Sequence, residues 1–198
     1  MKIEFVREED AARLSEIYAP YVRDTWGTFE VQAPSAAEIS KRIRDYTQSY
    51  PWVVALDPQQ ASRDQQIVGY AYASAFRTRV AYQWSCEVSV YIDEGARAKG
   101  IGSQLYRELF DLLERQGRRN AFAVIGLPND ASVHFHEKFG FEAVGILRDA
   151  GHKLGAWRDV GLWQKRFQID PGAPSAPRDL SACVREWEAH RSSSPTPP

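Results

Sequence analysis

The stretch ARAKGIGSQLY at residues 96–106 decides how the chain folds, because two different periodicities meet there. Upstream, SCEVSVYI at 85–92 alternates between two faces in the manner of a β-strand. Downstream, apolar residues recur at helical spacing from Ile101 to Leu113, and Gly117 is a natural helix stop. The sequence therefore predicts a strand, a tight loop and a helix in succession.

The glycines of this loop allow two interpretations. Gly100 and Gly102 let the backbone approach a ligand closely, and a helix start offers unpaired N–H groups that suit a phosphate or pyrophosphate. Arg97 and Lys99 add positive charge at the same place. A plain turn that caps the helix is the commoner meaning of two such glycines alone. Leu105 stands where a Rossmann loop needs its third glycine, and no GxxxxGK[ST] run is present.

The rest of the chain alternates between strand and helix patterns, which predicts a single α/β domain over 1–167. We expect a mixed twisted sheet of about seven strands, flanked by about four helices. NAFAVIGL at 120–127 is apolar on both faces, as in a central strand covered on both sides. The polar run at 57–66 predicts a mobile hairpin loop, and residues 168–198 predict a linker, a short helix and a disordered tail. The expected strands are 2–6, 52–56, 66–76, 82–92, 120–127, 141–151 and 157–167, and the expected helices are 7–22, 36–49, 100–116 and 129–139.

The bulk composition excludes several classes of partner. The net charge is −1 and no basic stripe stands out, so we expect no nucleic acid. The apolar runs are too short to cross a bilayer, and the N-terminus has no apolar signal core. Cys86 and Cys183 lie far apart and form no metal or disulfide motif. These features favour a cytoplasmic protein with free thiols and no membrane partner.

Longer blocks of sequence carry a family resemblance that covers roughly residues 2 to 167. Arg97-x-x-Gly100-x-Gly102 at the head of a helix resembles the acetyl-CoA pyrophosphate loop of the GNAT superfamily of N-acetyltransferases. Within it, the chain resembles the phosphinothricin and methionine sulfone/sulfoximine acetyltransferases, which are dimeric and transfer acetyl from acetyl-CoA to the α-amino group of a small amino-acid-like substrate. The matching blocks are TFE at 28–30, YPWVVA at 50–55, GYAYA at 69–73, FRTRVAYQWSCEVSVY at 76–91, GLPNDASVHFHEKFGF at 126–141 and KLGAWRDVGLWQ at 153–164.

The resemblance implies a cofactor site on the strand and loop quoted first. In this superfamily two central strands splay apart, and the pantetheine chain pairs with the exposed backbone. Asn129 matches a position that contacts the CoA arm, although an N-cap of the following helix explains it as well. The implied cofactor contacts are Ser89, Val90, Tyr91, Arg97, Ala98, Lys99, Gly100, Ile101, Gly102, Ser103, Asn129 and Lys138.

Glu87 is the first catalytic candidate, because a carboxylate in the middle of a half-buried strand is disfavoured unless it is paired or hydrated. Burial would raise its pKa toward the range that suits a general base, which acetylation of an ammonium group needs. The alternatives are a glutamate on a solvated sheet face and one paired with an arginine. The resemblance implies that Glu87 is the base.

His136 is the second catalytic candidate. Many relatives carry Tyr here, proposed to protonate the departing thiolate, whereas the closer relatives have His and pair it with the Glu. The role of His136 stays open between acid and second base, with a structural histidine as the third alternative. His134 and His136 point to different sides of a helix and make a poor metal pair, so we expect no metal.

FRTRVAY at 76–82 is the expected substrate segment. Arg77 and Arg79 can pair with a carboxylate or phosphinate, and as alternate residues of a strand they would share one face. Tyr82 and Phe29 would contact the amino acid. Solvated charges on an edge strand are the alternative for each arginine. His152 stands where the family has an aromatic residue, which could change the preferred amino acid.

Two other functions stay open on the sequence. One is acetylation of a protein or peptide N-terminus, since fold alone does not fix the acceptor. The other is an acetyl-CoA sensor without catalysis, against which the presence of both Glu87 and His136 counts.

Overall fold

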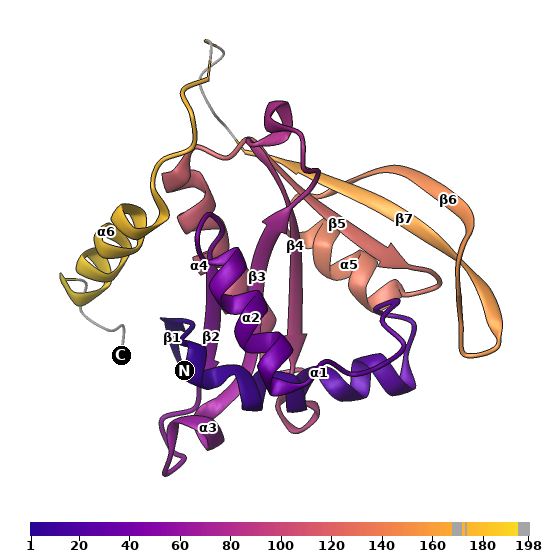
Figure 1. Cartoon of the computed structure of the whole chain (residues 1–198), viewed down its shortest axis with the longest axis horizontal. Helices are drawn as coiled ribbons and strands as arrows, with labels where there is room; N and C mark the ends of the chain where they lie inside the picture. The colour runs from indigo at the N-terminus through magenta and orange to yellow at the C-terminus, as the bar shows by residue number, and fades with distance from the viewer. Residues whose placement is uncertain (168–171, 173, 194–198) are drawn as a thin grey trace.

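A seven-stranded mixed sheet forms the centre of the computed structural model, which describes residues 1–167, 172 and 174–193 (Figure 1). The strand order is β1-β2-β3-β4-β5-β7-β6. This arrangement confirms the predicted α/β class and the predicted mixed sheet. The strands are β1 (Lys2–Phe5), β2 (Trp52–Leu56), β3 (Ile67–Ala75), β4 (Ser85–Ile92), β5 (Asn120–Gly126), β6 (Glu142–Lys153) and β7 (Ala156–Arg166).

The parallel pair β4 and β5 separates part-way along its length. The two strands are paired only at Ser85–Asn120, Cys86–Ala121 and Glu87–Phe122. Beyond Glu87, β4 continues against β3 alone and β5 continues against β7 alone. The splayed central strands expected from the resemblance are therefore present, and the fork begins at Glu87.

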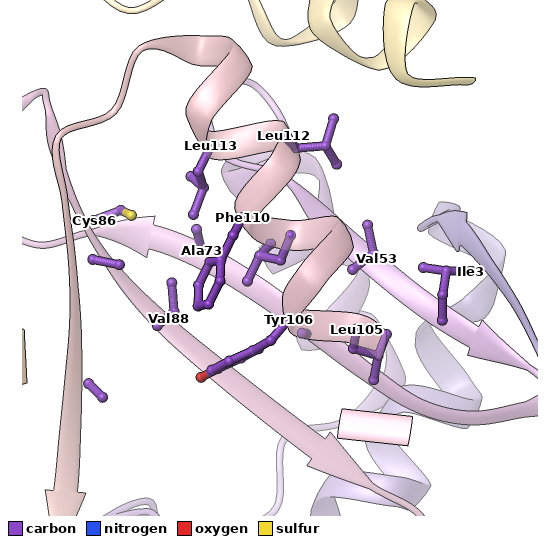
Figure 2. Packing of buried hydrophobic residues seen from close by; sticks show 14 of the residues in the cluster. Ile3, Val53, Ala73, Cys86, Val88, Leu105, Tyr106, Phe110, Leu112 and Leu113 are labelled. Carbon is purple, nitrogen blue, oxygen red and sulfur yellow. The ribbon is translucent and has the colours of Figure 1, made fainter. Parts of the chain in front are cut away.

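Helices pack on both faces of the sheet and bury two apolar clusters. The first cluster lies under α4 (Ile101–Gln116), whose Leu105, Leu109 and Leu113 are fully buried (Figure 2). The second lies under α1 (Ala11–Asp24) and α2 (Ala36–Tyr46) and is built largely from tyrosine rings and Trp52. In β4, Cys86 and Val88 belong to the first cluster, and Val90 and Ile92 pack against it, whereas Tyr91 packs against the second, which agrees with the predicted alternation of faces.

The predicted helix boundaries follow local capping chemistry. Ser35 accepts a hydrogen bond from the Glu38 N–H while the Glu38 side chain accepts from the Ser35 N–H, which is the predicted capping box of α2. Asn129 caps α5 (Asp130–Lys138) by accepting from the Ser132 N–H. Gly117 ends α4 in the left-handed conformation, with φ 78°.

Three segments differ from the sequence prediction. The 57–66 segment is not simply a loop, because α3 (Arg63–Gln66) forms there and Arg63 pairs with the buried Asp10. The expected strand 66–76 ends at Ala75 and the expected strand 82–92 begins only at Ser85, with a 3-10 turn at Val80–Tyr82 between them. The face of β5 opposite α4 is only partly covered, because 40% of the Val124 surface is exposed.

The C-terminal helix α6 (Leu180–Ser193) packs on the outer side of α4. Trp187 is 1% exposed and belongs to the first apolar cluster. Its indole N–H donates to Glu108 of α4 at 2.7 Å, and Arg191 forms an ion pair with the same carboxylate. The predicted short helix is thus present, whereas much of the predicted linker and tail lies outside the described residues. Across the described residues, no helix combines the length and the apolar character that a membrane span requires.

Candidate active site

A cavity of about 460 Å³ occupies the fork between β4 and β5. The first turn of α4 closes one side of this cavity, and α5 closes another. Of the twelve residues expected to contact acetyl-CoA, ten line the cavity. They are Ser89, Val90, Tyr91, Arg97, Ala98, Gly100, Ile101, Gly102, Ser103 and Asn129.

Lys99 and Lys138 stand apart from the other ten. Both side chains are exposed and neither lines the cavity. Their assignment as cofactor contacts stays a prediction. Tyr21 of α1 and Phe135 of α5 line the cavity although the sequence had not marked them, because only the fold brings these two helices beside β4.

The loop before α4 has the backbone shape that a phosphate cradle requires. Ala98 and Gly100 both have positive φ angles, 62° and 73°, so the chain turns sharply into the helix. A Cβ added at Gly102 would lie 3.3 Å from the Phe135 ring, which leaves little room for any larger residue. The Arg97 guanidinium lies over the Tyr21 ring at 5.1 Å and borders the cavity. Free N–H groups, a helix N-terminus and one cation therefore meet at this end of the cavity.

Glu87 lies at the fork itself, on the α1 side of the sheet. It occupies the last paired position of β4 and directly precedes Val88, the first β4 residue that lines the cavity. Burial raises the pKa of the Glu87 carboxyl above its usual 4.5, and the positive charge of Arg77 works in the opposite direction. Within the described part of the chain, Glu87 has no hydrogen-bond or ion-pair partner. This carboxylate is half-buried and free to accept a proton.

His136 is buried in the wall of the cavity, and both of its ring nitrogens have protein partners. Nδ1 lies 2.7 Å from the Ser132 carbonyl oxygen, and Nε2 lies 2.9 Å from the Tyr106 hydroxyl. Burial lowers the pKa of His136, although its bond to the Ser132 backbone acts in the opposite direction. A carbonyl at Nδ1 and a hydroxyl at Nε2 suit a neutral imidazole, and the role of His136 stays a prediction.

The expected substrate residues lie around the Glu87 side of the sheet, but not as a strand would place them. Because 76–84 forms a loop and a 3-10 turn, Arg77 and Arg79 do not share a strand face, and that expectation is wrong. The Arg77 guanidinium lies 4.4 Å from the centre of the Phe76 ring, which stacks on Phe122 at 4.1 Å. Arg79 and Tyr82 are exposed, which leaves both available to a ligand.

The Phe29 ring packs against two glycines, Gly126 and Gly151. A Cβ on Gly151 would lie 2.2 Å from the Phe29 ring, and one on Gly126 would lie 3.3 Å from it. Gly126 ends β5 and Gly151 belongs to β6. The Phe29 ring therefore packs the segment after α1 against the β6–β7 hairpin. Its expected role as a wall of the substrate pocket stays a prediction.

The segment after α1 makes further contacts through three residues that the sequence had not indicated, Trp26, Lys153 and Arg158. The Trp26 indole N–H donates to the Pro128 carbonyl at 2.8 Å, and the Arg158 guanidinium lies over the Trp26 ring at 4.0 Å. The buried Lys153 ammonium donates to the Thr28 carbonyl at 2.6 Å. These contacts join residues more than a hundred positions apart, so no local pattern could have indicated them.

Comparison with known proteins agrees with this geometry. The family model described as an acetyltransferase (GNAT) domain matches residues 3–162. The chain belongs to the GNAT family of acetyltransferases. A phosphinothricin N-acetyltransferase of Streptomyces viridochromogenes is 37% identical, over 86% of this chain and 88% of the relative. A methionine sulfoximine/sulfone acetyltransferase of Pseudomonas paraeruginosa is 30% identical, over 85% of this chain and 98% of the relative.

A solved structure agrees in fold as well. The phosphinothricin acetyltransferase of Sinorhizobium meliloti, in complex with AcCoA, has a TM-score of 0.81 and 36% identity, and the match covers 88% of this chain and 92% of that one. Family membership and the cavity together make the chain an acetyl-CoA-dependent N-acetyltransferase.

Proposed function

We propose that the chain transfers acetyl from acetyl-CoA to the α-amino group of a small amino-acid-like acceptor, such as phosphinothricin, methionine sulfone or methionine sulfoximine. The observation that carries this proposal is Glu87, a half-buried carboxylate that has no hydrogen-bond or ion-pair partner among the described residues, at the fork that opens into the cofactor cavity. The relatives named for phosphinothricin and for methionine sulfoximine and sulfone support this class of acceptor. Resistance to the herbicide phosphinothricin would follow from such an activity.

In this proposal, different residues would bind acetyl-CoA and accept the proton of the amine. The N–H groups at the start of α4, together with Arg97, would hold the pyrophosphate. The β4 backbone from Ser89 to Tyr91, which has no β5 partner, would bind the pantetheine arm, and one of its N–H groups would polarise the thioester carbonyl. Acetyl-CoA supplies a thioester that an amine can attack directly. Glu87 would remove the proton that the attacking amine must lose.

Acceptor recognition would use the groups around Glu87. Arg79 would pair with the acceptor carboxylate, Tyr82 would contact its side chain, and Phe29 would close the pocket. Arg77 would contribute positive charge close to Glu87. These roles agree with the exposure of Arg79 and Tyr82 and with the packing of Phe29 against Gly126 and Gly151.

A thiol-release assay over a panel of amines tests this proposal. We expect turnover of phosphinothricin and of methionine sulfone, and a kcat/KM about 10- to 100-fold lower for the C-terminal amide of methionine sulfone, since the amide loses a charged hydrogen bond to arginine. Arg79→Gln should remove the preference for the free acid and leave the KM for acetyl-CoA unchanged. If no amine of the panel turns over while calorimetry detects bound acetyl-CoA, the small-acceptor proposal is wrong.

The proposal includes a homodimer in the cytoplasm. The two cysteines, Cys86 and Cys183, are buried free thiols, which suits a reducing compartment. The β6–β7 hairpin extends from one side of the sheet (Figure 1). Several of its large apolar side chains are exposed, which would suit a contact with a second copy. These side chains are Val144, Ile146, Leu147, Leu154 and Trp157, each 47% to 64% exposed.

Light scattering after size exclusion tests the dimer. We expect the wild-type chain to have twice the monomer mass at micromolar concentration, and Ile146→Asp combined with Trp157→Asp to shift it to the monomer. Each aspartate would have to lose its hydration in an apolar contact. Val80→Asp is the matched control, because Val80 is 77% exposed and lies in the 3-10 turn between β3 and β4, outside the hairpin. A monomeric wild type, or a dimer that survives both substitutions, would contradict this assignment.

A further inference from the structure

The Tyr106 hydroxyl is in contact with His136 in the interior of the protein, and neither the comparisons nor the proposed mechanism uses it. Tyr106 is 0% exposed and comes from the second turn of α4, whereas His136 comes from α5. The hydroxyl oxygen lies 2.9 Å from His136 Nε2, and the two rings meet edge to face with centres 5.5 Å apart. Figure 2 shows the Tyr106 hydroxyl at the outer end of a ring that otherwise packs among apolar side chains.

The partners of His136 determine which of its nitrogens carries the proton. A carbonyl oxygen can only accept, so the 2.7 Å contact with the Ser132 carbonyl places a proton on Nδ1. In a neutral ring Nε2 then carries a lone pair, and the Tyr106 hydroxyl must donate to it. Ser132 Oγ, 3.4 Å from Nδ1, is compatible with the same arrangement.

The surroundings of His136 favour this neutral form. Phe135 on its own helix and Phe141 just after that helix meet the imidazole edge to face, with ring centres 5.5 Å and 5.1 Å away. From α4 the facing titratable group is Tyr106, which in turn is close enough to Cys86 and Tyr72 for electrostatic influence. Burial lowers the pKa of His136, and among the described residues no charged side chain acts on it.

We propose that Tyr106 is a positioning residue that keeps His136 neutral, with its proton on Nδ1 and its only lone pair engaged. His136 then forms a fixed, uncharged part of the cofactor cavity wall, and the proton of the attacking amine goes to Glu87 without passing through the imidazole. An imidazolium could exist only if the Tyr106 hydroxyl accepted instead of donating, which would leave its own proton buried without another acceptor among the described residues. This inference rests on the proposed function, and it assigns His136 neither the role of acid nor that of base.

Nuclear magnetic resonance of protein labelled with ¹⁵N in its histidine rings tests the proposal directly. The chain has four histidines, so His136→Gln identifies the signals of His136 by subtraction. We expect the wild-type spectrum to show the Nδ1–H tautomer of His136, unchanged from pH 8 to pH 6. Tyr106→Phe should redistribute the tautomers and raise the titration midpoint by about one pH unit, since it removes one hydrogen bond that stabilises the neutral ring.

Phe110→Leu is the matched control, because Phe110 packs on Tyr106 with ring centres 4.8 Å apart and makes no contact with His136 Nε2. It should loosen the same cluster and leave the tautomer of His136 unchanged. The pH profile of kcat/KM gives a second measurement, in which Tyr106→Phe should show one ionisation more than the wild type.

Two results would overturn the proposal. One is a wild-type His136 that carries its proton on Nε2 or titrates near 6.5, and this result does not depend on the folding of any variant. The other is a folded Tyr106→Phe protein whose His136 signals and pH profile match the wild type. Failure of the proposed function would be seen separately, as an absence of turnover across the amine panel.

Discussion

Replacing Glu87 with glutamine is expected to lower kcat about 100-fold or more, with little change in the KM for acetyl-CoA. Glutamine has nearly the same size and can still lie at the fork of β4 and β5, but it cannot accept a proton from the attacking amine. The cofactor cavity is lined by other residues, so binding of acetyl-CoA should persist. Steady-state kinetics with saturating acceptor, together with calorimetric titration of acetyl-CoA, measures both quantities.

The pH dependence of kcat/KM in the wild type is a second test of Glu87 as the base. Burial raises the pKa of Glu87 above 4.5, so the base form is lost as the pH falls through a value higher than that of an ordinary glutamate. The wild-type kcat/KM should therefore fall on the acid side above pH 4.5, and the glutamine variant should lack this fall. Arg77→Gln removes a positive charge that lowers the pKa of Glu87, so it should move the acid limb to higher pH.

Glu142→Gln is the control for a change of charge alone, since Glu142 is an exposed residue at the start of β6. It should leave kcat and the acid limb unchanged. Near wild-type activity of Glu87→Gln would remove Glu87 from the role of base. An acid limb that persists in that variant would assign the ionisation to another group.

Much of the fold could be predicted because its signals are local. The alternation at 85–92, the glycine loop and the apolar stripe of α4 each lie within one short stretch of chain, and the caps at Ser35 and Asn129 depend on side chains three residues apart. Ten of the expected cofactor residues line one cavity for the same reason, since a strand and the loop after it carry most of them.

The expectations that failed depend on contacts between distant parts of the chain. The apolar residues of β5 predicted cover on both faces, but the α1 side stays open at Val124 because β4 diverges from β5 there. Arg77 and Arg79 were expected at alternate positions of a strand, yet the pairing of β3 with β4 stops at Ala75. The state of His136 depends on Tyr106, thirty positions away, so the sequence alone left its role open.

Trp187 offers the largest expected effect on stability. Its ring is 1% exposed between α6 and α4, and its indole N–H donates to Glu108. Trp187→Ala should lower the free energy of unfolding by about 3–5 kcal/mol, because it removes a large buried ring and leaves a cavity. Urea denaturation followed by circular dichroism measures this loss. The kcat of the folded protein should change little, since the residues that line the cofactor cavity do not include Trp187.

Trp187→Phe separates packing from hydrogen bonding in the same contact. Phenylalanine keeps most of the buried ring but loses the donor to Glu108, so it should destabilise the protein by only about 1–2 kcal/mol. If the alanine variant instead loses less than about 1 kcal/mol, α6 is an appended segment and not part of the cooperative unit. A loss of the expected size would mean that the domain continues beyond 167, through a helix that lies outside the family resemblance but covers α4, the helix whose first turn borders the cofactor cavity.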